Sequence, residues 1–262
     1  MKSVATAIIS ALILTGCATT APPPSTGSLS GNWQILLSSA SSSGAETGFI
    51  IQSGNSVSGN VLSSGQVISG QATCGAVGSV QGQLNNTDVT ITITLPGQSL
   101  NLTGKTAANS GTMGGKYSLL AAGCGQTDTG TWSGSRINTL SGGFRATFTS
   151  SALTSPFHFS GTIKQAANSG QSTAALSGSM NSNDSPCFTN AAIAGVVTGT
   201  SVTINILASD GEAYGKLSGV MSPDAGLING SFVLSNASDP ALLQTCQGVG
   251  GNATVSVQLS PT

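Results

Sequence analysis

The chain has a single histidine, His158, and therefore one imidazole available for acid–base chemistry near neutral pH. His158 lies between Phe157 and Phe159, and alternation along a strand places the two phenylalanines on one face and the imidazole on the other. The phenylalanines should face the core, which leaves His158 at the surface. No Gly-x-Ser-x-Gly elbow accompanies it. We therefore expect a surface histidine rather than a catalytic base.

Two carboxylates close in sequence, Asp210 and Glu212, flank Gly211. A pair of carboxylates can hydrolyse a glycosidic bond by general acid–base chemistry. Asp-Gly is also a strong hairpin signal, because both residues tolerate the backbone angles of a tight turn. We interpret this segment as a solvated turn, so the sequence predicts no catalytic residue.

Metal binding is poorly supported. Asn181, Asn183 and Asp184 offer oxygen ligands of the type that calcium takes, but the Gly and terminal Glu of an EF-hand loop are missing. They are expected to form a polar loop before Cys187. The chain also has no Cys-x-x-Cys pair, which argues against zinc. We predict no metal and no cofactor.

The amino-terminal segment carries a targeting pattern that ends at Cys17. Met1-Lys2 is followed by an apolar run from Val4 to Leu14, which is too short to span a bilayer. Leu14-Thr15-Gly16-Cys17 resembles the lipobox of bacterial lipoproteins. The resemblance implies cleavage before Cys17, acylation of that cysteine and membrane attachment through the lipid. Because Ala18 is not the Asp that retains some such lipoproteins at the inner membrane, the outer membrane is the expected destination.

Residues 18–28 read as a spacer between this anchor and the folded part. Three consecutive prolines, Pro22 to Pro24, favour an extended conformation of about 3 Å per residue. The spacer would lift the folded part about 30 Å from the lipid surface.

Composition narrows the partners. Charged residues make up 6% of the chain, with 7 basic and 8 acidic side chains. No basic patch is present, so nucleic acid is an unexpected partner. Solubility must come from Ser, Thr, Asn, Gln and Gly.

After residue 28 the chain shows an internal duplication. Leu29-Ser30-Gly31 restarts as Leu140-Ser141-Gly142. Cys74 matches Cys187 at a separation of 113 residues, and Val89 matches Val202 at the same separation. Further matches pair Gly48–Gln52 with Gly161–Gln165, Leu102–Gly104 with Leu217–Gly219, Gly114–Leu119 with Asn229–Leu234, and Cys124 with Cys246. We predict two domains, 29–137 and 138–262, after a signal peptide at 1–16 and a lipidated tether at 17–28.

Each half is predicted to contain eight antiparallel strands. Val89-Thr90-Ile91-Thr92-Ile93-Thr94 alternates apolar and polar residues, as a half-buried strand does. No stretch after residue 16 has a convincing helical period. We place strands near 32–38, 47–53, 56–62, 78–84, 88–94, 99–104, 112–119 and 129–136, and near 143–149, 157–164, 173–180, 192–198, 201–207, 213–219, 227–234 and 252–259.

A recurring triplet indicates how the strands bend. A large apolar residue, a small or polar one and then Gly occur together at Val57-Ser58-Gly59, Val80-Gln81-Gly82, Leu176-Ser177-Gly178 and elsewhere. The glycine shares the inner face with the apolar residue, which lets the strand bend sharply and the sheet close. We predict an all-β chain of two tandem eight-stranded barrels, with β-sandwiches as the alternative.

The opening Gly31-Asn32-Trp33 and the meander resemble the calycin-type barrels, which include lipocalins and avidins. The resemblance covers architecture only and implies no ligand residues. Trp33 and Trp132 fall on the first and last strands of the first half, so closure should bring them into one core. A membrane-spanning barrel is disfavoured, because the strands read as about seven residues, short of the roughly 9–11 needed, and aromatic residues are 4% of the chain.

The four cysteines after Cys17 suggest two disulfides in an oxidising compartment, for which three pairings exist. The duplication and the meander favour one bridge per half. In each half the two cysteines follow the third and seventh strands, whose connections lie at the same barrel end. We predict Cys74–Cys124 and Cys187–Cys246.

No motif in the sequence identifies a ligand, so the functional expectation rests on the anchor, the composition and the predicted fold. We expect a non-catalytic envelope lipoprotein, tethered to the membrane and acting as a structural or protein-contacting component. The alternative is a module that binds an apolar or sugar ligand at a barrel mouth. Filled interiors would leave loops as binding surface. The end without cysteines would then be the freer one, at the hairpins near Gly54-Asn55, Asn85-Asn86, Ser169-Gly170 and Thr200-Ser201.

Overall fold

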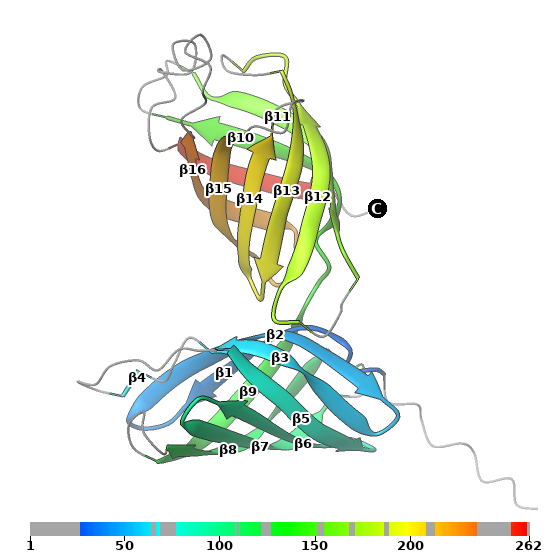
Figure 1. The fold of residues 1–262 in the computed structure, drawn as a ribbon, viewed down its shortest axis with the longest axis vertical. Helices are drawn as coiled ribbons and strands as arrows, with labels where there is room; N and C mark the ends of the chain where they lie inside the picture. The colour runs from blue at the N-terminus through cyan, green and yellow to red at the C-terminus, as the bar shows by residue number, and fades with distance from the viewer. Residues whose placement is uncertain are drawn as a thin grey trace, which may run out of the picture.

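The structure is a computed structural model that describes residues 27–63, 67–68, 77–107, 109, 111–121, 127–150, 155–167, 171–185, 189–207, 213–234 and 253–260. Two tandem antiparallel barrels of eight strands account for the ordered structure in these ranges, and no helix occurs there (Figure 1). The predicted fold class is confirmed, and the β-sandwich alternative is wrong because each sheet closes on itself.

The first barrel closes through β1, which pairs with β2 on one side and with β9 on the other. Its strands are β1 (Gly31–Ser38), β2 (Ser42–Ser53), β3 (Ser56–Ser63), β5 (Val77–Asn85), β6 (Asp88–Leu95), β7 (Gln98–Thr106), β8 (Thr112–Ala121) and β9 (Asp128–Ile137). The short β4 (Val67–Ile68) adds to the start of β2 and was not predicted from the sequence. β2 also begins earlier than the expected position near residue 47.

The second barrel closes where its first strand pairs with its last. Its strands are β10 (Ser141–Thr149), β11 (Phe157–Gln165), β12 (Ala174–Asn181), β13 (Asn190–Thr198), β14 (Ser201–Leu207), β15 (Ala213–Met221), β16 (Leu227–Leu234) and β17 (Ala253–Ser260). Every neighbouring pair is antiparallel, so successive connections alternate between the two ends of the barrel.

The barrel interiors are apolar, as alternation along the strands requires. Val89, Ile91 and Ile93 are buried in the first barrel, and their counterparts Val202, Ile204 and Ile206 are buried in the second. Both tryptophans belong to the first core, as predicted. At the end of the second barrel that faces away from the first, four phenylalanine rings pack with centroids 5.0 to 5.5 Å apart, namely Phe148, Phe157, Phe159 and Phe232.

Inner-face glycines permit close approach of neighbouring strands. A Cβ atom on Gly59 would lie 2.1 Å from the carbonyl oxygen of Phe49, and one on Gly195 would lie 2.2 Å from that of Thr203. No side chain fits at either position, so glycine is required where the strand bends across its neighbour.

One hydrogen-bond motif occurs in both barrels and supports the duplication. The backbone N–H of Leu29 donates to Gln52 Oε1 at 2.8 Å, and that of Leu140 donates to Gln165 Oε1 at 3.0 Å. In each barrel the glutamine N–H in turn donates to a serine hydroxyl, at Ser30 and Ser141 respectively. The glutamine thus fixes the entering segment against the second strand in both halves.

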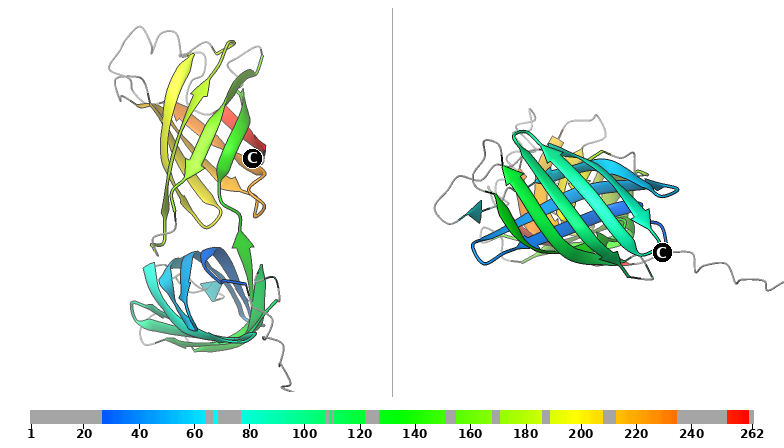
Figure 2. Two further views of the ribbon diagram at one scale, coloured as in Figure 1. Left: turned by 90° about the vertical axis from the view of Figure 1, so that its right-hand side faces the viewer. Right: turned by 90° about the horizontal axis from the view of Figure 1, so that it is seen from below.

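The second barrel stands with one end against the outer wall of the first (Figures 1 and 2). Only residues 138–140 separate β9 from β10. At the junction Asn32 Nδ2 donates to the Gly199 carbonyl at 3.0 Å, and the Asn138 N–H donates to that of Pro223 at 2.9 Å. Phe49 points outward from β2 and joins the buried cluster of the second barrel.

The expectation that the ends without cysteines are the freer ones is therefore wrong for the second barrel. Its turn at Gly199-Thr200 lies against β2, and Gly199 is buried. The physical reason is the connection between barrels. Three residues span at most about 10 Å, so the end at which the chain enters β10 must stay beside the end of β9.

Candidate functional site

A polar hollow of about 550 Å³ lies on the outer wall of the second barrel, over β10, β11 and β17 and beside residues 181–184. The alignment of the three strands places their outward-facing side chains in two rows that run across the strands. One row contains His158, Thr147 and Ser256, and the other contains Ser160, Arg145 and Gln258. Asn181 extends the second row onto β12. The closed sheet holds these side chains on a rigid surface.

His158 is exposed, as predicted, but the structure gives it a partner that the sequence did not reveal. Asp184 accepts a hydrogen bond from the His158 backbone N–H at 2.9 Å and contacts His158 Nδ1 at 2.8 Å. Hydrogen bonds from the His158 backbone and side chain lower the pKa of Asp184 to about 2. An ionised carboxylate requires a proton on Nδ1, which leaves Nε2 available to a ligand.

Arg145 supplies the fixed positive charge of the hollow. It lies between Ser160 and Gln258 on adjacent strands and forms no ion pair within the described part of the chain. The Ser160 hydroxyl donates to Asn181 Oδ1 at 3.1 Å, which leaves the amide N–H groups of Asn181 for other acceptors. The hollow therefore combines one guanidinium with several neutral hydrogen-bonding groups.

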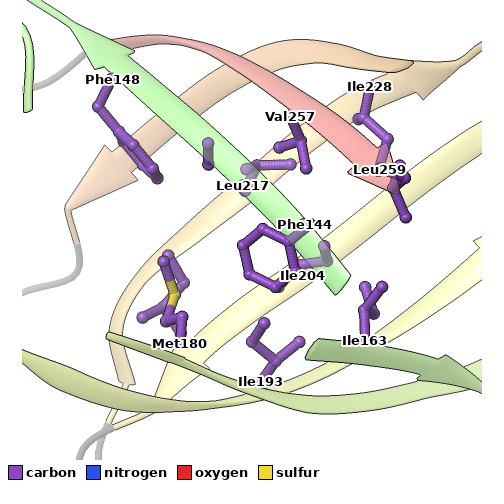
Figure 3. A pocket seen from close by; sticks show the side chains of 12 residues that line it. Phe144, Phe148, Ile163, Met180, Ile193, Ile204, Leu217, Ile228, Val257 and Leu259 are labelled. Atoms are coloured by element: carbon purple, nitrogen blue, oxygen red, sulfur yellow. The ribbon is translucent and has the colours of Figure 1, made fainter. Parts of the chain in front are cut away.

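The interior of the second barrel offers little room. Its cavity measures about 20 Å³ and is lined by apolar side chains that point inward from the surrounding strands (Figure 3). That volume is close to the minimum of about 10–15 Å³ for a single water, and an apolar cavity has no groups to hold one. The predicted filled interior is confirmed for this barrel.

The first barrel carries a second group of polar residues, at the end where β2 and β9 begin. Asp128 accepts hydrogen bonds from the Tyr117 hydroxyl at 2.6 Å and the Ser42 hydroxyl at 2.5 Å. Burial acts to raise the pKa of Asp128, but these hydrogen bonds outweigh it and lower the pKa below its usual value. Burial and the contact with Asp128 raise the pKa of Tyr117.

Glu46 lies on the inner face of β2 and is 3% exposed. Its Oε1 accepts a hydrogen bond from Ser63 at 2.8 Å, whereas Oε2 has no hydrogen-bond partner. Burial raises the pKa of Glu46 to about 7, although the bond from Ser63 acts in the opposite direction. The sequence could have revealed this position, because Glu46 has the parity of the inward-facing Ile50. It was missed because the strand was expected to begin near 47.

Several predicted positions fall outside the described residues: Cys17, Cys74, Cys124, Cys187, Cys246 and the pair Asp210 and Glu212. The lipid site, both disulfides and the expected turn at Asp210-Gly211 therefore stay predictions. Asn183 and Asp184 lie in the segment after β12, where a polar loop was expected. Among the described residues no group of three or more His, Cys, Asp or Glu side chains could hold a metal ion.

No protein-family model matches the chain, and a comparison with curated proteins also finds no match. Within the described ranges, none of the secondary structure is a helix long and apolar enough to cross a membrane.

Proposed function

We propose that the chain is a non-catalytic lipoprotein of the bacterial envelope, anchored through Cys17 and acting as a structural or protein-contacting component. The tether at 17–28 links the lipid to the first barrel. Arg136 supports this arrangement, because its guanidinium donates to the Ser28 carbonyl and lies 5.3 Å from the Trp33 ring centroid. The tether thus meets a well-fixed point on the barrel wall.

The filled interior of the second barrel is the main observation that supports a structural or protein-contacting role. A carrier of apolar molecules needs an internal cavity, and ligand pockets usually measure about 300–1,000 Å³. The interior cavity of about 20 Å³ falls far short of this. The outer walls carry the polar residues that alternate with buried ones along the strands, together with exposed apolar side chains such as Leu120, Val196 and Val220. Such a wall suits a protein that meets partners or solvent through its surface.

A small-molecule binding function at a barrel mouth is the second candidate, and Glu46 is the observation that favours it. A buried carboxyl oxygen without a hydrogen-bond partner is costly, so such a group calls for a functional explanation. Asp128 and Tyr117 lie at the same end of the first barrel. A hydrolase is the weaker alternative, because within the described ranges His158 bonds to the Asp184 carboxylate and to no nucleophile.

Mass spectrometry of the mature amino-terminal peptide tests the anchor. We expect Cys17 to be the first residue and to carry acyl chains, because two or more chains are needed for firm membrane attachment. Cys17→Ser should release the protein into the soluble fraction while both barrels remain folded. An unmodified Cys17, or cleavage at another position, contradicts the proposal. Separation of inner and outer membranes on a density gradient then tests the expected outer-membrane destination.

A further inference from the structure

The outer-wall hollow of the second barrel has the size and chemistry of a ligand site. Neither membrane attachment nor packing of the barrel interior accounts for it. Its volume of about 550 Å³ lies within the range of small-molecule pockets. Most of its polar side chains come from strands whose register fixes their spacing, and those of residues 182–184 come from the segment after β12. The site is therefore preformed and independent of the membrane anchor.

Charge selects the class of ligand. Arg145 is a guanidinium without an ion-pair partner in the described residues, and its planar fork matches a carboxylate through two parallel hydrogen bonds. Asp184 adds one negative charge nearby, although His158 and Ser182 already hydrogen-bond to it. The hollow as a whole is close to neutral, so it should accept a single negative charge more readily than the double charge of a phosphate.

The other side chains of the hollow indicate which kind of molecule carries the carboxylate. Asn181, Gln258 and His158 Nε2 present hydrogen-bonding groups around Arg145. Such groups match hydroxyl groups at several positions, which an apolar acid lacks.

We propose that this hollow binds an acidic sugar, whose carboxylate pairs with Arg145 and whose hydroxyls bond to Asn181, Gln258 and His158. Asp184 acts as a positioning residue, because it holds the imidazole with Nε2 turned to the ligand. The barrel wall provides the rigid platform that spaces the carboxylate contact from the hydroxyl contacts.

Titration of the purified full chain, followed by NMR, tests the proposal with sodium glucuronate as the probe. Glucose lacks the carboxylate, acetate lacks the ring, and inorganic phosphate carries the higher charge. We expect saturable binding of glucuronate that shifts the Arg145 and His158 side-chain resonances, and weaker binding of all three comparison ligands. Equal binding of glucose or of acetate, equal or tighter binding of phosphate, or the absence of saturable glucuronate binding, would overturn the proposal.

Substitutions locate the binding. Arg145→Gln should lower the affinity for glucuronate about tenfold or more, since hydrogen bonds to charged groups contribute about 1.5–3 kcal/mol. The affinity of Arg145→Lys should lie between those of the wild type and Arg145→Gln, because lysine keeps the positive charge but lacks the planar fork of the guanidinium. Lys164→Gln, an exposed change on the neighbouring strand β11 but outside the hollow, should bind as the wild type does. If Arg145→Gln folds and binds glucuronate normally, the assignment is wrong; if it does not fold, the Arg145→Lys result decides.

Discussion

At the scale of single residues, Glu46 makes the stability of the first barrel depend on pH. Its pKa rises from the ordinary value of 4.5 to about 7 because burial disfavours the charged form. The folded protein then holds this proton more tightly than the unfolded chain does. Stability therefore falls as the pH rises from 4.5 to about 7 and stays at the lower level above that window.

Glu46→Gln tests this dependence. The shift corresponds to a loss of about 3 kcal/mol across the window, and a glutamine, which does not titrate, should remove most of it. Both tryptophans of the chain lie in the first barrel, so their fluorescence during urea unfolding reports this barrel selectively. We expect the unfolding free energy of the wild type to fall between pH 4.5 and 7.5, and that of Glu46→Gln to change much less.

Asp88→Asn provides the matched control. Asp88 is also a carboxylate of the first barrel, but its side chain is 66% exposed and pairs with Lys105 at the surface. Exposed ion pairs contribute about 0–1 kcal/mol. The control should therefore follow the wild-type pH profile. A Glu46→Gln profile parallel to that of Asp88→Asn would show that Glu46 is not the titrating group.

At the scale of elements, the turn between β13 and β14 connects the second barrel to the wall of the first. Gly199 has a φ of +56°, and a Cβ atom there would lie 2.3 Å from Thr47 Cβ on β2. Gly54, in the turn between β2 and β3, has a similar φ of +58° but nothing within 4 Å of an added Cβ atom. The two glycines thus share a backbone requirement and differ in their surroundings.

Gly199→Ala and Gly54→Ala separate these two contributions. A non-glycine residue in the left-handed region costs about 1–2 kcal/mol, and both variants should lose that amount. Gly199→Ala should lose about 1–3 kcal/mol more, because the added methyl group forces the turn away from Thr47. Calorimetric unfolding of the two variants measures the difference. Equal losses would contradict the packing of this turn against the first barrel.

The strands were predictable because their faces differ in polarity, whereas contacts between distant strands were not. Val89, Ile91 and Ile93 alternate with threonines and mark an inner face directly. Phe49 and Ile50 are adjacent and both buried, since the second barrel covers the outer face of β2. The alternation of polar and apolar residues along β2 therefore could not show which of the two, Phe49 or Ile50, faces the barrel interior. The wall hollow depends on the pairing of β10 with β17, which closes the second barrel and places Thr147 beside Ser256. These strands lie far apart in the sequence, so the residue pattern within either strand does not indicate how the two are aligned.

At the scale of the whole molecule, the orientation of the barrels bears on the cysteines. In the second barrel β12 and β16 end, and β13 and β17 begin, at the barrel end away from the first barrel. That end is separated from the junction by the length of the strands, which are 8 or 9 residues each at about 3.3 Å per residue. A disulfide needs Cα atoms within about 7 Å. Bridges between the barrels would have to cross that distance.

Of the three possible pairings, we therefore predict Cys74–Cys124 and Cys187–Cys246. In each barrel both connections leave the same end, because β3, β5, β8 and β9 in the first correspond in order to β12, β13, β16 and β17 in the second. The bridges would close loops of about 50 and about 60 residues, and each would stabilise its barrel by about 4 kcal/mol in the chain-entropy account. Peptide mapping without reduction should find these two linkages. Cys187→Ser with Cys246→Ser should then destabilise the second barrel and leave the tryptophan-reported unfolding of the first unchanged, whereas a linkage between barrels would contradict both the pairing and the arrangement of the two barrels.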